Sequence, residues 1–290
     1  MNFIFLGSPR FAEIALKTLI RAGVKPLLLI TNPDRPFGRK MIVTPPSAKV
    51  LALENNIPVF QPEKLNYRDL KTELNKRKIE PDYFVVAAYS QILKKDVINI
   101  PKFGTLGIHP SLLPKFRGAT PIQSAILSND KETGVSIYFL NEGVDSGPIV
   151  ATRVQPIAPP AGEQAIDYLE LEEKLARIGG ELIVEILPKI LKNEIKAVPQ
   201  NEKEATYTKK FSSKDGLIEL KDLNEAVELG GEKAILIDKK IRAIGHEPGV
   251  YTIKNNKRIK LLSAELSQKK LKLKIIQKEG KKPIEFKNEI

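Results

Sequence analysis

The first half of the chain alternates short apolar runs with amphipathic segments. Residues 2–7, NFIFLG, end at a glycine, and residues 8–23 then carry apolar side chains at helical spacing. The alternation continues with strands expected at 24–31, 58–60 and 82–89 and with helices expected at 48–55 and 66–78. This order predicts a parallel sheet with helices on both faces, a Rossmann-like α/β fold.

The apolar pattern changes after the predicted sheet begins. Residues 32–47 contain four prolines and predict a loop. Two further strands are expected at 133–140 and 147–154, followed by an amphipathic helix at 168–192. The apolar side chains of that helix share one face: Leu175, Ile178, Leu182, Ile186 and Ile190.

The end of the chain has shorter apolar runs. Strands are expected at 207–211, 239–245, 249–266 and 271–283, and KNNKR at 254–258 indicates a hairpin turn. These runs predict a small β barrel. We therefore expect an α/β domain at 1–192, a polar linker at 193–204 and a basic barrel domain at 205–290.

The predicted sheet also predicts where a ligand binds. The first strand is followed by GSPRF, which lacks the G-x-G-x-x-G spacing, so a dinucleotide is not indicated. Ligands of such sheets bind beyond the carboxyl ends of the strands. Here these ends lie at Gly7, Thr31, Tyr89 and the segment around His109.

Composition and charge narrow the class of protein. The 290 residues include no cysteine and two histidines, which excludes disulfides and argues against a zinc site. No apolar run approaches 18 residues, so we expect a cytoplasmic protein that does not bind membranes. The net charge is +12, and residues 205–290 carry 20 Lys and Arg against 12 Asp and Glu. This balance indicates a polyanionic partner, nucleic acid before membrane.

Two residues stand out as candidate chemistry. His109 lies in GTLGIHPSLLPKFRGATPIQ, a segment constrained by prolines, and Asp145 lies in the turn NEGVDSGPI. Each alone also fits a structural role, as a buried histidine or as an ordinary turn aspartate. Together they form a better candidate, because a carboxylate beside an imidazole orients it for acid–base work.

These segments, with TNPDRPFGRK and PDYFVVAAYSQIL, resemble the folate-dependent formyltransferases over nearly the whole chain. The branch that acts on tRNA is the most similar. The resemblance implies an OB-like C-terminal barrel. It also implies transfer of a formyl group from 10-formyltetrahydrofolate to the α-amine of methionine on initiator tRNA, for translation initiation. The enzyme is expected to use no metal and to act as a monomer.

The resemblance assigns roles to individual residues. His109 would stabilise the oxyanion, Asp145 would keep His109 charged and relay a proton, and Arg117 would lie at the rim of the site. The expected folate-binding residues are Tyr89, Ser90, Gln91, Ile92, Ser111, Leu112, Leu113 and Pro114. The expected tRNA-binding residues are Arg35, Arg39, Lys40, Lys209, Lys210 and Arg242.

Gly107 departs from the family pattern. The family motif is Asn-x-His, and its Asn donates a hydrogen bond to the formyl oxygen, whereas this chain has glycine two residues before His109. Losing one such donor costs on the order of 10²–10³ in rate. We expect compensation by a water or by Ser90, which stands where the family has glycine.

Two alternatives remain open at this point. One is a formyltransferase acting on a small amine, a sugar nucleotide or glycinamide ribotide; the basic 205–290 region argues against it. The other is a weakened folate- or tRNA-binding relative that has lost its chemistry through the change at Gly107. The presence of both His109 and Asp145 argues against that.

Overall fold

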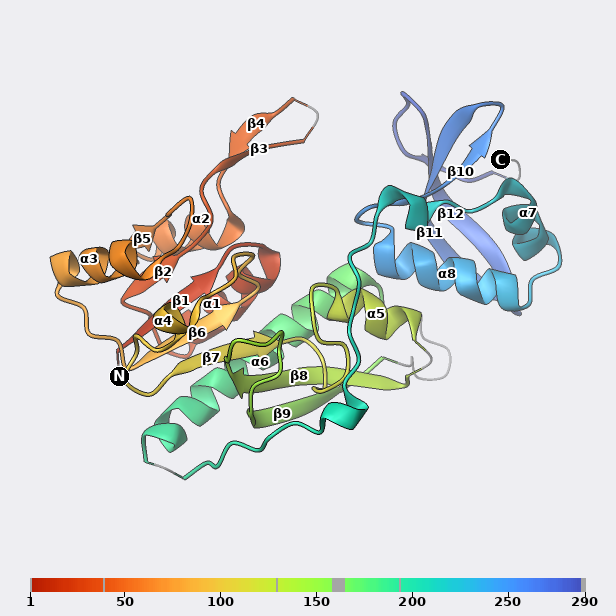
Figure 1. Cartoon of the computed structure of the whole chain (residues 1–290). Helices are drawn as coiled ribbons and strands as arrows, with labels where there is room; N and C mark the ends of the chain where they lie inside the picture. The colour runs from red at the N-terminus through yellow and green to blue at the C-terminus, as the bar shows by residue number, and fades with distance from the viewer. Residues whose placement is uncertain (1, 39, 129, 158–164, 193, 288–290) are drawn as a thin grey trace. The chain divides into compact units, whose positions relative to one another are not determined.

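The computed structural model describes residues 2–38, 40–128, 130–157, 165–192 and 194–287 (Figure 1). It forms two compact units, each built from separate parts of the chain. Unit 1 comprises Met1–Arg117, Gly134–Gln155 and Glu172–Tyr207. Unit 2 comprises Gly118–Thr133, Pro156–Leu171 and Thr208–Ile290. The predicted domain limits follow chain order instead, and they stay a prediction.

A seven-stranded mixed sheet organises unit 1. Its strands run in the order β5-β2-β1-β6-β7-β8-β9. Pairing is parallel from β5 to β7 and antiparallel between β7 and β8. The bounds are β1 (Phe3–Gly7), β2 (Leu28–Ile30), β5 (Val59–Phe60), β6 (Tyr83–Ala87), β7 (Thr105–His109), β8 (Glu132–Phe139) and β9 (Ile149–Pro156). The Rossmann-like α/β fold predicted from the sequence is confirmed.

Helices cover both faces of this sheet, as the alternating pattern predicts. The helices are α1 (Arg10–Arg21), α2 (Ser47–Glu54), α3 (Tyr67–Arg77), α4 (Lys95–Ile98) and α6 (Tyr168–Leu191). On one face, Ile4 and Phe84 form a buried cluster with Leu70 of α3 and Val97 of α4. On the other face, α6 packs against β7 and β8, because Gly179 leaves room for Ile108. Figure 1 shows α6 running along the sheet.

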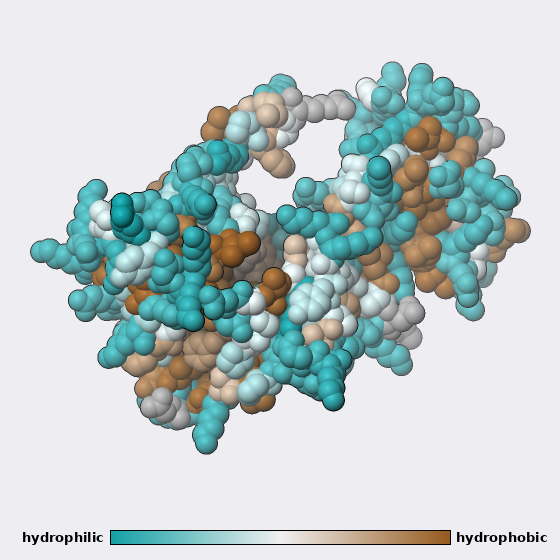
Figure 2. Space-filling model, in the orientation of Figure 1, coloured by the Kyte–Doolittle hydropathy of each residue, from teal (hydrophilic) through white to brown (hydrophobic). Residues whose placement is uncertain are grey.

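The segment at 32–47 is a hairpin, so the loop expected there is wrong. Strands β3 (Arg35–Phe37) and β4 (Ile42–Thr44) pair antiparallel. The hairpin tolerates its prolines because a two-stranded ribbon has free edges. Phe37 is 77% exposed, and hydrophobic residues colour part of this hairpin in Figure 2.

Unit 2 contains an antiparallel sheet with helices. Strands β10 (Val250–Lys254), β11 (Lys257–Ser267), β12 (Lys270–Lys278) and β13 (Ile284–Glu285) pair in that order. This four-stranded antiparallel sheet lies where the sequence predicts a small β barrel, and the hairpin expected at 254–258 is confirmed. The helices are α5 (Pro121–Leu127), α7 (Leu220–Glu228) and α8 (Glu232–Ile244).

The expected strand at 239–245 is wrong, because these residues belong mostly to α8. Ile237, Ile241 and Ile244 are all buried, and their helical spacing places them on one face. The short window KKIRAIG hides this spacing, which appears only when the preceding turns of the helix are included. The expected strand at 207–211 is also wrong, since only Tyr207 forms an isolated bridge there.

Candidate active site at the carboxyl edge of the sheet

The carboxyl ends of the parallel strands meet at one edge, as predicted. Thr31, after β2, donates its hydroxyl to Ser8 Oγ, after β1, over 3.0 Å. The backbone N–H of Asn32 donates to the same oxygen, and the Asn32 amide donates to Ser90 Oγ, after β6, over 2.8 Å. These contacts join three strand ends into one polar edge, where open α/β sheets bind ligands.

His109 is the last residue of β7 and is only 5% exposed. Its ring atom Nε2 lies 2.9 Å from the carbonyl oxygen of Phe116. Its other nitrogen, Nδ1, lies 3.5 Å from Asp145 Oδ2, which is an ion-pair distance. Because an oxygen acceptor faces each nitrogen, a doubly protonated imidazolium satisfies both contacts.

Asp145 is held in an uncommon backbone conformation on the loop between β8 and β9. Its φ is 47°, in the left-handed region that aspartate adopts more readily than most residues. The side-chain amide of Gln200 donates to the carbonyl oxygens of Asp145 (2.8 Å) and Gly147 (2.7 Å). Gln200, which lies outside the loop, therefore holds the loop backbone in place, and the Asp145 carboxylate faces His109.

Arg117 does not lie at a rim, because its side chain is fully buried. It donates to Gln200 Oε1 over 2.7 Å and to Glu202 Oε1 over 2.8 Å. The hydrogen bond to Glu202 raises the pKa of Arg117 above its usual value, against the opposing effect of burial. Arg117 therefore holds Gln200, which in turn holds the Asp145 loop. No motif in the sequence indicates this role for Gln200.

Gly107 lies directly opposite Tyr138 in the antiparallel pairing of β7 and β8. A Cβ at Gly107 would lie 2.5 Å from Cε1 and 2.8 Å from Cζ of the Tyr138 ring. The buried Tyr138 hydroxyl donates to Asp145 Oδ1 over 2.6 Å. Sequence reasoning missed Tyr138, because the pairing register that places it opposite Gly107 is a tertiary property.

The expected folate-binding residues after β7 form a tightly bonded turn. Ser111 is fully buried, and its hydroxyl donates to the carbonyl of Lys115 over 2.6 Å. Ser136 Oγ accepts from the Leu113 backbone N–H and donates to the Ser111 carbonyl. Leu112 and Pro114 are half-buried. The turn is thus fixed by its own hydrogen bonds.

The expected folate-binding residues after β6 differ in exposure. Tyr89 packs against the buried cluster of unit 1, and burial raises the pKa of its hydroxyl to about 12. Gln91 accepts from the Leu65 backbone N–H over 2.7 Å. Ser90 is exposed, and Ile92 is 92% exposed. Ile92 is therefore an apolar side chain already presented to solvent, whereas Tyr89 and Gln91 fix the loop.

The expected tRNA-binding residues also differ in availability. Arg35 and Lys40 are exposed on the hairpin, and Arg35 forms an ion pair with Glu63. Arg39 lies outside the described residues. In unit 2, Lys209 and Lys210 are exposed. The Arg242 guanidinium is instead engaged inside the unit, with Asp238 at 2.8 Å and with the Ile166 carbonyl, so Arg242 is the weakest of these candidates.

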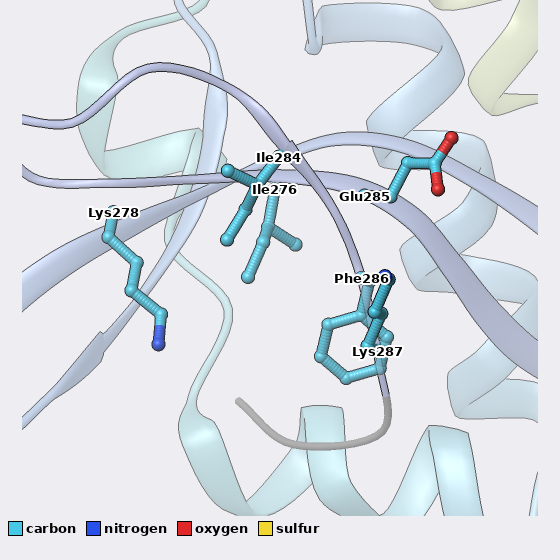
Figure 3. A pocket seen from close by; sticks show the side chains of 6 residues that line it. All are labelled: Ile276, Lys278, Ile284, Glu285, Phe286 and Lys287. Carbon is cyan, nitrogen blue, oxygen red and sulfur yellow. The ribbon is translucent and has the colours of Figure 1, made fainter.

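Other parts of the described chain offer weaker candidates for an active site. Within the described ranges, no three His, Asp or Glu side chains are arranged to hold a metal ion. No helix in the part of the chain that the structure describes is long and apolar enough to cross a membrane. A pocket of about 530 Å³ in unit 2 is lined by Ile276, Lys278, Ile284, Glu285, Phe286 and Lys287 (Figure 3). It contains no histidine beside its single carboxylate, so the His109 edge remains the candidate active site.

Comparisons with known proteins agree with this fold. The family model described as formyl transferase matches residues 1–187, and the model of the formyl transferase C-terminal domain matches residues 220–272. The methionyl-tRNA formyltransferase of Chloroflexus aurantiacus is 39% identical over 267 residues, which cover 92% of this chain and 81% of that protein. The chain therefore belongs to the formyltransferase family, and within it to the methionyl-tRNA formyltransferases.

Solved structures share the fold. The methionyl-tRNA formyltransferase from Clostridium thermocellum covers 99% of this chain and 100% of its own, with a TM-score of 0.60 and 17% identity. An N-formyltransferase from Helicobacter canadensis, solved with folinic acid and dTDP-3-aminofucose, covers 92% of this chain and 88% of its own. Its TM-score is 0.61 and its identity 20%. At these identities the likeness concerns the fold alone.

Proposed function

We propose that this enzyme transfers the formyl group of 10-formyltetrahydrofolate to the α-amine of methionine on initiator tRNA, with His109 and Asp145 at the reacting centre. The observation that carries this proposal is the buried His109–Asp145 pair at the carboxyl edge of the sheet, in a chain of this family. The proposal assigns chemistry to a pair that the sequence singles out and the fold brings together.

The reaction needs an electrostatic partner for the oxygen of the formyl group. Attack of the amine nitrogen on the formyl carbon forms a tetrahedral oxyanion. His109 Nε2–H now faces the neutral Phe116 carbonyl, and an oxyanion is a stronger acceptor. We infer that His109 exchanges the Phe116 carbonyl for the oxyanion, and that Asp145 balances the imidazolium charge. Collapse breaks the bond from the formyl carbon to the folate nitrogen.

The proton count assigns a second task to the pair. The attacking amine must lose a proton, and the folate nitrogen must gain one as tetrahydrofolate leaves. An imidazolium beside a carboxylate can give a proton to the folate nitrogen as it leaves and then take one back from the amine, so it ends in the protonation state in which it began. We therefore assign this relay to His109 and Asp145, whose side chains lie within 3.5 Å of each other.

The folate is proposed to bind at the polar edge beside His109. Ser90 and Ile92 would contact it from the β6 end, and residues 111–114 would contact it from the β7 end. The exposure of Ile92 and the rigidity of the 111–114 turn support this assignment. A rigid turn lowers the entropic cost of ordering the site on binding.

The tRNA is proposed to contact the basic residues of both units through its phosphates. Arg35 and Lys40 on the hairpin, and Lys209 and Lys210 in unit 2, are exposed and suited to this task. Phosphate contacts supply affinity without reading the base sequence. The proposal extends to domain limits of 1–192, 193–204 and 205–290, to a cytoplasmic location and to a monomeric state.

A transfer assay tests the function directly. Purified enzyme is given formyl-labelled 10-formyltetrahydrofolate with methionine-charged initiator tRNA, uncharged tRNA, or a dTDP-linked amino sugar. Label is expected on the charged tRNA alone. Label on the amino sugar at a higher rate would replace this proposal with the small-amine alternative. No transfer to any acceptor would favour the binding-only alternative.

A further inference from the structure

We propose that Tyr138 is a positioning residue for formyl transfer, which occupies the space beside Gly107 and holds the Asp145 carboxylate toward His109. This inference rests on the proposed function, because it concerns the same reacting centre. Tyr138 is not expected to touch either substrate. Its role is to fix the geometry of the two residues that do.

The first argument is mutual exclusion at a cross-strand pair. Gly107 and Tyr138 are direct partners of β7 and β8, so their side chains share one face of the sheet. A Cβ at Gly107 would meet the Tyr138 ring at 2.5 Å and Leu140 Cδ1 at 2.7 Å. The leucine end can move, but the ring cannot move without repacking the sheet. The aromatic ring therefore fills the place into which an asparagine at position 107 would project.

The second argument is that the two carboxylate oxygens of Asp145 contact different residues. Oδ1 accepts from the Tyr138 hydroxyl at 2.6 Å, and Oδ2 lies 3.5 Å from His109 Nδ1. The short bond to Tyr138 sets the rotation of the carboxylate. That rotation decides whether the second oxygen faces the imidazole. Without the hydroxyl, this short bond no longer sets the rotation, and Oδ2 is held less firmly toward His109.

The third argument concerns the protonation of the phenol. Burial and the negative charge of Asp145 raise the pKa of the Tyr138 hydroxyl well above its usual range. The phenol therefore stays protonated and keeps donating to the carboxylate. A permanent donor is what a fixed carboxylate needs, because a hydrogen bond to a charged acceptor is stronger than one between neutral groups.

These contacts explain why glycine occupies position 107, which the sequence alone does not explain. The chain does not place a second donor where the family has asparagine. It places an aromatic ring there. The hydroxyl of this ring bonds to Asp145, which in turn faces the His109 imidazole. Since the remaining donor, His109, is held in place before charge develops, its contribution to the transition state is retained.

The decisive variant is Tyr138→Phe, which removes one oxygen and keeps the ring. We expect kcat to fall about tenfold, the scale of one lost hydrogen bond to a charged group, with both KM values within about twofold. The matched control is Tyr83→Phe, because Tyr83 is also fully buried in this sheet and its hydroxyl has no partner among the described residues. A Tyr138→Phe enzyme with the kcat of the wild type would overturn the inference.

A second readout does not depend on turnover. The chain has two histidines, so the ring signals of His109 can be assigned by NMR with a His246→Gln variant. Tyr138→Phe should shift the His109 signals, and Tyr83→Phe should not. Unchanged His109 signals overturn the inference even if the wild type proves inactive on tRNA, an outcome that would separately reject the proposed function.

The exclusion itself is tested by a pair of substitutions. Gly107→Asn alone should reduce kcat more than tenfold, because the new side chain meets the ring. Combining it with Tyr138→Ala removes the ring, and the double variant should exceed Gly107→Asn in activity. If the double variant is no more active than the poorer single variant, the two side chains do not compete for this space.

Discussion

The His109 segment and the β3–β4 hairpin are both rich in proline and both carry predicted functional residues, yet they differ in burial. His109 is nearly inaccessible and faces an acceptor at each ring nitrogen. Phe37 on the hairpin is 77% exposed beside exposed basic residues. Groups that stabilise a transition state must be fixed in advance, whereas groups that bind a large polyanion need only be accessible. The two regions should therefore respond differently to substitution.

The largest expected effect is on kcat, after substitution of the buried pair His109 and Asp145. His109→Ala and Asp145→Ala should each lower kcat by at least ~10², the scale of an oxyanion or acid–base contribution. Steady-state kinetics with charged initiator tRNA measures it. The matched control is His246→Ala, since His246 stacks on Tyr168 in unit 2, with ring centroids 6.2 Å apart. Near-normal turnover of either site variant would remove that residue from the mechanism.

The next effect concerns the exposed side. Charge reversal on the hairpin, Arg35→Glu with Lys40→Glu, should weaken tRNA binding about tenfold and leave the KM for folate unchanged. The slope of log affinity against log salt should become shallower, because fewer counterions are released on binding. Lys17→Glu with Lys76→Glu, on α1 and α3, is the control, because it changes the net charge by the same amount. Equal losses in both proteins would mean that overall charge, and not the hairpin, sets tRNA affinity.

A smaller effect is expected on the pH dependence of folding stability, through the buried hydroxyl of Tyr83. Burial raises the pKa of the Tyr83 hydroxyl to about 12 in the folded protein, against about 10 when unfolded. Since the folded pKa is the higher one, this stabilisation is complete below pH 10 and is lost between pH 10 and 12. Tyr83→Phe should reduce that alkaline loss by about 1 kcal/mol. Urea unfolding at pH 9 and pH 11 measures it, and identical losses in both proteins would contradict the assignment.

The smallest effect tests the compensation expected from the sequence. Ser90 Oγ accepts from the Asn32 amide, so its hydroxyl belongs to the polar edge. Ser90→Gly should keep kcat within about twofold and raise the KM for folate no more than about threefold. A tenfold loss of kcat would restore Ser90 as the replacement for the missing asparagine and would weaken the case for Tyr138.

The sequence predicts the parts of this site that depend on local pattern. Apolar runs ending at Gly7, Thr31 and Tyr89 are enough to place the polar edge, and the motif around His109 marks the residue that we propose to react. Tyr138 and Gln200 escape such reasoning for a different reason. Tyr138 matters because of the register between β7 and β8, and Gln200 matters because the chain returns to the Asp145 loop 55 residues later. Long-range pairing of this kind leaves no local signature.

The opposed pair Gly107 and Tyr138 also constrains how such a sequence can change over generations. A chain with a side chain at 107 cannot accept the ring at 138 in one step, since the two would overlap. The side chain at 107 has to be lost first, and a glycine there stays viable only while the reaction tolerates the gap. Once the ring is in place, the return path is closed unless both positions revert. The two positions are therefore coupled, because a side chain at 107 and the ring at 138 would occupy the same space.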